Sequence, residues 1–575
     1  MNFDIESRTN SLRIAAIAIM LTLFAVSVTA MPPNPETLEE HLGTGNDLPY
    51  YLQNRPALLD LGVNSPGKMT VSPAKANISG TWRGLAILVS FSDKPASADA
   101  ADFDTLLFVN RQGTVRHYYN EVSRGQLDIV TLDLPSNLGW IEAPETYAYY
   151  CNGENGTGAY PNNSQKLCED VTALIDPYID FSQYDNDNDG YVDAVILIHT
   201  GKGAEFSHSN DDIWSHKWSI WPPQSKDGVY LFDYNIQPEY WNSPGDITCG
   251  VFCHELGHIF GLPDLYDTDY SSRGIGKYSL MSYGSWCGPT GMGDYPAWLD
   301  AWCRIELGFE SYTNVTVNTD NAVIGAMENG GTVYRLWSSG AIGSEYYLVE
   351  NRQKTGYDSY IPASGLYIWH IDENSLGTMA PNDDEWYPGH TSGGNYGVAL
   401  EQADGQYHLE KLINSGDAGD PFPGISSNTL FSPFSTPNSD NYIGDNTYVA
   451  VSNISSSSNV MTADFQVSFV SDVEESNDNL LPEKIQLGQN YPNPFNPNTN
   501  IYLETPVSGH VHVFIYDILG RKIYELLNEY VPAGEGVILT WDGRDSDGRE
   551  VSSGIYFYEV VTEHDKEVRK MTLIK

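Results

Sequence analysis

Basic residues are scarce in this 575-residue chain, which has 30 Lys and Arg against 76 Asp and Glu and a formal net charge of −46. Nucleic acids and anionic membranes attract proteins through a basic face, so this shortage speaks against both as partners. Charged residues of either sign make up only 18% of the chain, which speaks against a chain that its charge keeps disordered. Tyr, Trp and Gly are instead plentiful, as in a soluble, β-rich protein of several domains.

Cysteine is absent from most of the chain, and all six residues lie between Cys151 and Cys303. In an exported protein an even, clustered set favours disulfides, and Cys151 with Cys168 is the candidate local pair. Buried free thiols are the alternative. Because residues 31–79 contain no cysteine, a cysteine latch on a metal is excluded for that segment.

Long apolar runs are missing after residue 30, so no later segment is predicted to span a membrane. Residues 1–30 have the pattern of a signal peptide, because an uncharged apolar run ends at the small-residue cleavage site Val28-Thr29-Ala30. A transmembrane anchor is the alternative, although the run is short for a bilayer. Residues 31–79 are Pro-rich with little periodicity, which indicates a pro-segment or spacer. We therefore expect an exported chain without a stable membrane span.

The middle of the chain divides by its patterning into two parts. From 80 to 311, strand-like and helix-like segments alternate, which predicts an α/β (α+β) domain. From 312 to 470, strand-like runs follow one another without a long helix, which predicts a β-rich domain. The segments of the first part are strands at 84–91, 127–134 and 192–199 and helices at 115–122 and 165–175.

The C-terminal part, 485–575, follows an acidic linker at 471–484 and consists of short alternating strands. Turn signals such as Asp547-Gly548 separate them, a pattern typical of an immunoglobulin-like β-sandwich. The segment resembles the C-terminal sorting domain of type IX secretion cargo, through YPNPFNP, WDGRDSDG, SSGIYFY and KMTLIK. That resemblance implies the type IX secretion machinery as a partner and a secreted or cell-surface location. An accessory sandwich that binds something else is the alternative.

The strongest chemical signal is VFCHELGHIFGLPDLYD at 251–267. Its apolar spacing predicts a helix that ends at Gly261. His254 and His258 are one turn apart on one face, as two ligands of a tetrahedral zinc require. Gly261 permits the sharp turn that brings Asp264 back as a third ligand and leaves the fourth position open. A core helix with two buried histidines is the alternative, which the extended HExxHxxGxxD pattern disfavours.

Two further residues fit the same chemistry. Glu255, next to the first ligand, can accept a proton from metal-activated water and pass it to a leaving amine. Met281 follows His258 by 23 residues within YSLMSYGSW. A methionine in a tight turn beneath the metal is the mark of metzincins.

From Gly84 to about Asn453 the chain resembles the immune inhibitor A-type metallopeptidases, which are metzincin-like zinc peptidases. The resemblance rests on motifs spread over this range, among them ILVSFSDKP, YYNEVSRGQL, YDNDNDGYVDAVILIH, DDIWSHKW, CHELGHIFGLPDLYD, SLMSYGSW, YYLVENRQ, GLYIWHID and GDAGDPFPG. It implies a zinc-bound catalytic domain with His254, His258 and Asp264 as ligands, Glu255 as base and Met281 as the turn methionine.

Tyr283 departs from that family, whose members often have Gly two residues after the methionine. Astacin- and serralysin-like metzincins place a tyrosine there that reaches the metal or the oxyanion. Tyr283 is therefore a candidate catalytic residue, and a packing role is the alternative.

A second cation site is predicted in a DxDxDG loop. Carboxylates at alternate positions can converge on calcium, and Gly190 supplies the bend. Position twelve is Ile196, so the loop is not an EF-hand. An Asp/Asn-rich turn without an ion is the alternative, and Asp417 with Asp420 form a weaker candidate site. The predicted calcium ligands are Asp185, Asp187, Asp189, the Tyr191 carbonyl and Asp193.

These patterns together predict an exported, calcium-stabilised zinc endopeptidase that hydrolyses peptide bonds in proteins. A surface adhesin on a degenerate peptidase fold is the rival, and the intact Glu255 argues against it. A narrow processing protease and a broad scavenging protease remain equally compatible with the sequence.

Overall fold

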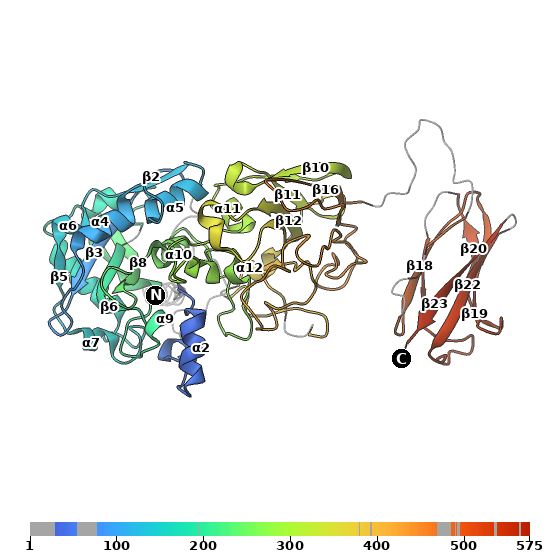
Figure 1. Ribbon diagram of the computed structural model, residues 1–575, viewed down its shortest axis with the longest axis horizontal. Helices are drawn as coiled ribbons and strands as arrows, with labels where there is room; N and C mark the ends of the chain where they lie inside the picture. Colours follow the sequence, from blue (N-terminus) through green and yellow to red (C-terminus); the bar gives the residue numbers. More distant parts are fainter. Residues whose placement is uncertain are drawn as a thin grey trace, which may run out of the picture. The chain divides into compact units, whose positions relative to one another are not determined.

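The computed structural model describes residues 29–54, 78–193, 195–378, 380–390, 394–468, 485–488, 490, 495–533, 537–562 and 565–574. Most of the predicted signal peptide, much of the predicted spacer and the predicted linker lie outside these ranges. The chain forms two compact units, Met1–Phe469 and Val470–Lys575 (Figure 1). In the part that the structure describes, no helix combines the length and apolar character that a bilayer crossing needs.

A six-stranded sheet forms the framework of the first unit, in the order β1-β7-β8-β6-β3-β5. The strands β8, β6, β3 and β5 are parallel, whereas β7 runs antiparallel to β8 and β1 antiparallel to β7. All of β3 is buried, as its near-continuous apolar run predicts. The bounds are β1 Thr29–Ala30, β3 Leu85–Ser90, β5 Trp140–Glu142, β6 Val195–Lys202, β7 His216–Lys226 and β8 Val229–Tyr240. One of the two edge strands, β1, is thus contributed by the N-terminal segment.

Helices cover both faces of this sheet. Alternate side chains of β3 enter two different cores: Leu88 packs in one with residues of α5 and α10, and Ile87 in the other with residues of α8. The helices are α4 Ala100–Phe108, α5 Val115–Val122, α6 Pro135–Leu138, α7 Tyr147–Cys151, α8 Ser164–Ile175, α9 Ala204–Ser207, α10 Cys249–Ile259 and α11 Ala301–Glu306. A parallel pair, β2 Gly80–Arg83 and β4 Leu127–Val130, adds a small second sheet. The predicted mixed α/β architecture is therefore confirmed.

The β-rich part of the first unit has two sheets of its own, in the orders β14-β13-β12-β11-β9 and β10-β16-β15. They share a third apolar core that includes Ile324, Val349, Ile368 and Phe465. The strands are β9 Tyr312–Asn314, β10 Thr319–Gly325, β11 Val333–Leu336, β12 Glu345–Arg352, β13 Gly365–Asp372, β14 Val398–Leu400, β15 Ala450–Ser452 and β16 Val460–Gln466, and the short helix α12 Glu373–Leu376 follows β13.

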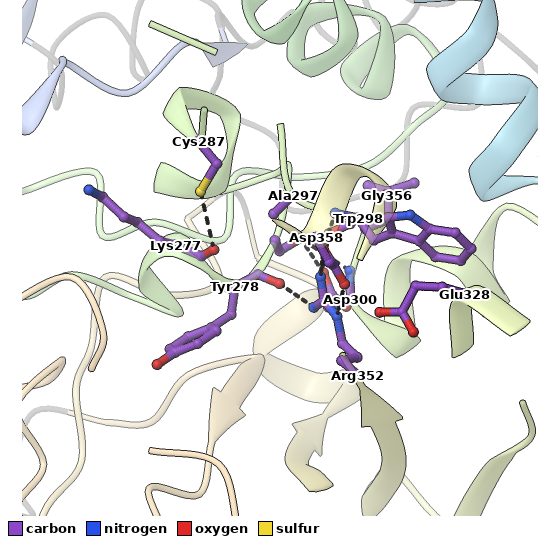
Figure 2. Close-up of polar contacts among 12 residues, drawn as sticks. Lys277, Tyr278, Cys287, Ala297, Trp298, Asp300, Glu328, Arg352, Gly356 and Asp358 are labelled. Carbon is purple, nitrogen blue, oxygen red and sulfur yellow. Dashed lines mark hydrogen bonds and ion pairs between the residues drawn. The ribbon is translucent and has the colours of Figure 1, made fainter. Parts of the chain in front are cut away.

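A buried ion pair at the end of β12 connects this β-rich part to the loop 279–297 (Figure 2). Arg352 binds both carboxylate oxygens of Asp358, with Nε–Oδ2 at 2.8 Å and Nη2–Oδ1 at 2.7 Å. Its remaining donors reach the backbone carbonyls of Tyr278 and Trp298, which bracket the loop. Both side chains are almost fully buried, and the shared hydrogen bonds offset the cost of desolvating the charges.

The second unit is all β, with sheets in the orders β17-β18-β21 and β20-β19-β22-β23. Every pairing within them is antiparallel. The buried side chains of the unit form one core that includes Ile501, Val513, Trp541 and Tyr558. The strands are β17 Gln486–Leu487, β18 Thr499–Glu504, β19 Gly509–Asp517, β20 Lys522–Val531, β21 Val537–Trp541, β22 Gly554–Val561 and β23 Lys566–Leu573.

Two features differ from the expectations. All six cysteines are free and buried, so the predicted Cys151–Cys168 pair is wrong and the alternative of buried thiols holds. The Sγ of Cys151 instead contacts the carbonyl of Asn210 at 3.3 Å, and Cys168 packs on α8 within an apolar core. The predicted spacer also contains a helix, α2 Pro35–Gly43, which Asn34 caps.

Candidate active site

The HExxH motif of residues 254–258 lies on α10, whose residues are all buried. His254 and His258 occupy successive turns, and their Nε2 atoms are 3.1 Å apart. Two imidazole nitrogen atoms at this distance can bind the same metal ion. The helix ends near Gly261, which has a φ of 100°, a value that favours glycine.

The turn at Gly261 brings Asp264 back to the two histidines. Its Oδ1 lies 3.3 Å from His254 Nε2 and 3.1 Å from His258 Nε2, and the carboxylate is almost fully buried. Ligands that lie about 2.0–2.1 Å from a tetrahedral zinc are roughly 3.3 Å apart. The three atoms therefore have the spacing, and the two-nitrogen, one-oxygen chemistry, that a tetrahedral zinc ion requires. The structure thus brings together the three predicted ligands.

Backbone carbonyls fix both imidazole rings. Nδ1 of His254 donates to the carbonyl of Leu280 at 2.9 Å, and Nδ1 of His258 to that of Leu262 at the same distance. A proton held on Nδ1 leaves Nε2 as the acceptor atom, which is the form that binds a metal. Burial lowers the pKa of His258, against the opposing effect of the Asp264 carboxylate.

Glu255 contacts the N-terminal segment. Its Oε1 accepts a hydrogen bond from the backbone nitrogen of Met31 at 2.7 Å. The preceding residue, Ala30, pairs with His216 in the antiparallel β1–β7 ladder. An extended peptide therefore adds to the sheet edge and passes directly over the candidate base.

Three aromatic side chains hold the carbonyl oxygens of this extended peptide. The hydroxyl of Tyr266 donates to the Ala30 carbonyl at 2.7 Å. Indole Nε1 atoms donate to the next two carbonyls, from Trp214 to Met31 at 2.9 Å and from Trp286 to Pro32 at 3.0 Å. Each backbone carbonyl of residues 30–32 thus has a donor from the part 80–311 of the chain.

Met281 packs against Gly257 of α10, and the ring of Tyr283 lies next to that of Tyr266, with centroids 6.0 Å apart. Met281 is fully buried, and its backbone carbonyl accepts a hydrogen bond from the nitrogen of Leu265 at 2.8 Å. Tyr283 is also fully buried, and its ring faces the guanidinium of Arg273, 5.5 Å from the ring centroid. The catalytic role of Tyr283 stays a prediction.

The acidic loop brings three of its predicted residues together. One oxygen each of Asp185, Asp187 and Asp189 lies within 4.8 Å of the others. Asp193 lies outside this cluster, because its Oδ2 accepts hydrogen bonds from the backbone and side-chain nitrogens of Asn186. The prediction that Asp193 closes the site is therefore not supported by this arrangement.

Sequence reasoning missed two sets of residues. Tyr266 drew no attention, although it follows Asp264 by two residues in the same turn. Asp404 and His408 converge with Asp417 in a further potential cation cluster, of which only Asp417 had been considered. These three residues do not form a recognised motif in the sequence, so only the fold shows that they lie together.

Two known protein families match parts of the chain. Residues 96–311 match the family described as immune inhibitor A peptidase M6, catalytic domain, and residues 489–575 match the secretion system C-terminal sorting domain. The chain therefore carries a peptidase M6 domain of the immune inhibitor A type and a C-terminal sorting domain.

Two relatives are similar to parts of the chain. Immune inhibitor A of Bacillus thuringiensis subsp. alesti is 34% identical over 210 residues, which cover 30% of this chain and 29% of that protein. The pre-pro-metalloprotease PrtV of Vibrio cholerae serotype O1 (strain M66-2) is 28% identical over 294 residues, which cover 42% of this chain and 31% of that protein. The match thus spans less than a third of either relative.

Among solved structures, dimeric latent PorU from Porphyromonas gingivalis is 14% identical and has a TM-score of 0.15, with coverage of 44% of this chain and 20% of that one. A TM-score this low carries no conclusion about the fold.

Proposed function

We propose that the protein is an exported zinc endopeptidase that hydrolyses peptide bonds in proteins, with Glu255 as the general base. The observation that carries this proposal is the convergence of His254, His258 and Asp264 at 3.1–3.3 Å, next to Glu255. The match of residues 96–311 to the peptidase M6 catalytic domain supports it. The same convergence supports the metzincin-like interpretation, in which Met281 lies beneath the motif.

His254, His258 and Asp264 would hold the zinc ion, which when bound supplies a Lewis acid that acidifies water and polarises a carbonyl group. Glu255 lies where it can take a proton from the attacking water. Its contact with the Met31 nitrogen puts the same carboxylate within reach of a leaving amine. One side chain can therefore receive the proton and deliver it.

The edge of β7 provides the binding surface for substrate. The N-terminal segment already shows how an extended peptide binds there, through antiparallel pairing and the indole donors of Trp214 and Trp286. Because these contacts are made to backbone atoms, they suit protein substrates of many sequences.

The same contacts support a pro-segment role for the chain that follows Ala30. The segment also contacts His208, because Oγ1 of Thr37 lies 2.8 Å from Nε2 of that residue. In addition, the ring of Tyr51 stacks on that of Trp214, with ring centroids 4.9 Å apart. A segment that occupies the edge of β7 and contacts Glu255 excludes substrate until it is released. Removing residues 31–54 from the exported protein should raise its initial rate of casein cleavage.

Calcium and the sorting route are separate parts of the proposal. The cluster of Asp185, Asp187 and Asp189 would bind calcium and stabilise the loop before β6. The C-terminal unit, which matches the sorting domain, would adopt an immunoglobulin-like sandwich and direct export by the type IX machinery. The protein would then act outside the cell or at its surface.

Substituting Glu255 by Gln tests the proposal. The Glu255→Gln protein should bind zinc as the wild type does, because Glu255 is not a ligand, while casein turnover should fall by at least about a hundredfold. Chelation should abolish turnover of the wild type, and added zinc should restore it. Near-normal turnover by zinc-loaded Glu255→Gln protein would contradict the metallopeptidase assignment.

A further inference from the structure

One peptide bond of the N-terminal segment has both of its polar atoms held by the active site. The nitrogen of the Ala30–Met31 bond donates to Oε1 of Glu255 at 2.7 Å, and its carbonyl oxygen accepts from the hydroxyl of Tyr266 at 2.7 Å. The β1–β7 pairing fixes the register of this bond over α10. In the full-length chain, which still carries residues 1–30, this bond shows how one peptide bond can contact Glu255 and Tyr266 at the same time.

From this geometry we propose that Tyr266 is a catalytic residue, which donates a hydrogen bond to the scissile carbonyl oxygen and stabilises the negative charge that develops on it. This inference rests on the proposed peptidase function and identifies a further residue of the same site. It differs from the expectation for Tyr283, which the sequence had singled out for such a role.

The proton balance of hydrolysis is consistent with this assignment. Attack by water adds oxygen to the carbonyl carbon and shifts an electron pair to the carbonyl oxygen. Glu255 takes one proton from the water and gives it to the nitrogen, and the carbon–nitrogen bond then breaks to leave a carboxylic acid and an amine. The water's second proton then passes from the acid to the amine, which gives a carboxylate and an ammonium group. Tyr266 keeps its proton throughout, because it only donates a hydrogen bond to the oxygen that becomes negative.

The surroundings of Tyr266 hold its hydroxyl in place before substrate arrives. The residue is fully buried, and it follows Asp264 in the turn after Gly261. Its ring centroid lies 6.4 Å from that of His254 and 6.2 Å from that of Tyr270, with which it stacks. A donor fixed in this way pays little reorganisation cost during the reaction, which is what makes oxyanion stabilisation effective.

Tyr283 lies near Tyr266 but differs in its contacts. The two ring centroids are 6.0 Å apart. The Tyr283 side chain interacts with Arg273, whereas the Tyr266 hydroxyl contacts the peptide. Of the two hydroxyls, that of Tyr266 is therefore the one in position to donate to substrate.

The test compares Tyr266→Phe with two matched variants in the full exported protein. Tyr118→Phe removes the hydroxyl of another fully buried tyrosine. This hydroxyl donates to the backbone carbonyl of Ala297 at 2.8 Å and not to the peptide of residues 30–32. Tyr283→Phe removes the competing candidate. Steady-state kinetics use a fluorogenic, casein-derived peptide that the wild type cleaves, and metal analysis measures the zinc content of each protein.

We expect Tyr266→Phe to retain zinc and to lower kcat about 10²–10³-fold with KM changed less than about threefold, because the lost bond strengthens only in the transition state. Calorimetry should show a similar loss of affinity for a phosphinate analogue of the same peptide. Tyr118→Phe should keep wild-type kcat.

Three results would overturn the assignment: a Tyr266→Phe protein with kcat within threefold of wild type, an equal loss in Tyr118→Phe, or a loss confined to Tyr283→Phe. A zinc-containing wild-type protein that cleaves no peptide even after residues 31–54 have been removed would instead overturn the proposed function, so the two failures are distinguishable.

Discussion

Gly257 and Met281 are in direct contact: a Cβ atom on Gly257 would lie 2.5 Å from Sδ of Met281. Gly257 lies on α10 immediately before the proposed ligand His258, so the absence of a side chain there lets the methionine pack against the helix. Met281 is fully buried, which leaves little room for it to move aside.

Gly257→Ala should therefore overpack this contact. Overpacking of a buried site typically costs about 1–3 kcal/mol, and displacement of Met281 should shift the adjacent histidines. We expect a lower melting temperature and a lower kcat/KM, measured by calorimetry and peptide cleavage. Gly43→Ala on α2 is the control, since a Cβ there would meet nothing within 4 Å. Equal behaviour of the two variants would contradict the packing argument.

The third ligand can be tested through metal content alone. Asp264→Ala should lower zinc occupancy at neutral pH, because two histidines would remain. Asp269→Ala is the matched control: this carboxylate accepts a hydrogen bond from the nitrogen of Ser271 at 2.9 Å and should not change occupancy. Full occupancy in Asp264→Ala protein, measured by elemental analysis after dialysis, would move the third ligand elsewhere.

The carboxylate cluster of Asp185, Asp187 and Asp189 predicts that calcium stabilises the folded protein. Calcium should raise the melting temperature of the wild type, because an ion that binds the folded state stabilises it. Asp187→Ala combined with Asp189→Ala should remove most of that increase. Asp404→Ala is the comparison, since it belongs to the other carboxylate cluster. If the double variant kept the full increase and Asp404→Ala lost it, calcium would bind at the second cluster.

The sequence predicted the elements that depend on local patterning. The strand β3 follows from a near-continuous apolar run and the helix α5 from its local sequence pattern. The helix α5 is capped by Thr114, whose side chain accepts a hydrogen bond from the backbone nitrogen of His117. The ligand set also depends on local sequence, because His254, His258 and Asp264 lie within eleven residues on a helix and the turn after it.

Contacts between distant segments could not be predicted in this way. The hydrogen bond from Met31 to Glu255 joins residues separated by 224 positions, and that from Tyr266 to Ala30 spans 236. Such pairs leave no periodic signal, since they depend on how the whole sheet is ordered. The cysteines illustrate the opposite error: their spacing suggested a local bond, but Cys151 and Cys168 are free thiols although both are buried in the same apolar core.

The C-terminal unit should be dispensable for catalysis and required for export. Its buried side chains form a core of their own, and the chain divides into compact units at Phe469 and Val470, so few contacts should be lost by truncation. A chain that ends at residue 468 should fold and cleave casein in vitro at the rate of the full chain.

In its native host the truncated chain should accumulate in the periplasm, because it lacks the part that matches the sorting domain. Cell fractionation and immunoblotting would measure this, with the full-length Glu255→Gln protein as a control for effects of activity on the cell. That control should be exported normally, since its C-terminal unit is intact. A truncated chain that reached the surface at wild-type levels would contradict the sorting role, and a sandwich that binds substrate or cell wall would then be the better interpretation.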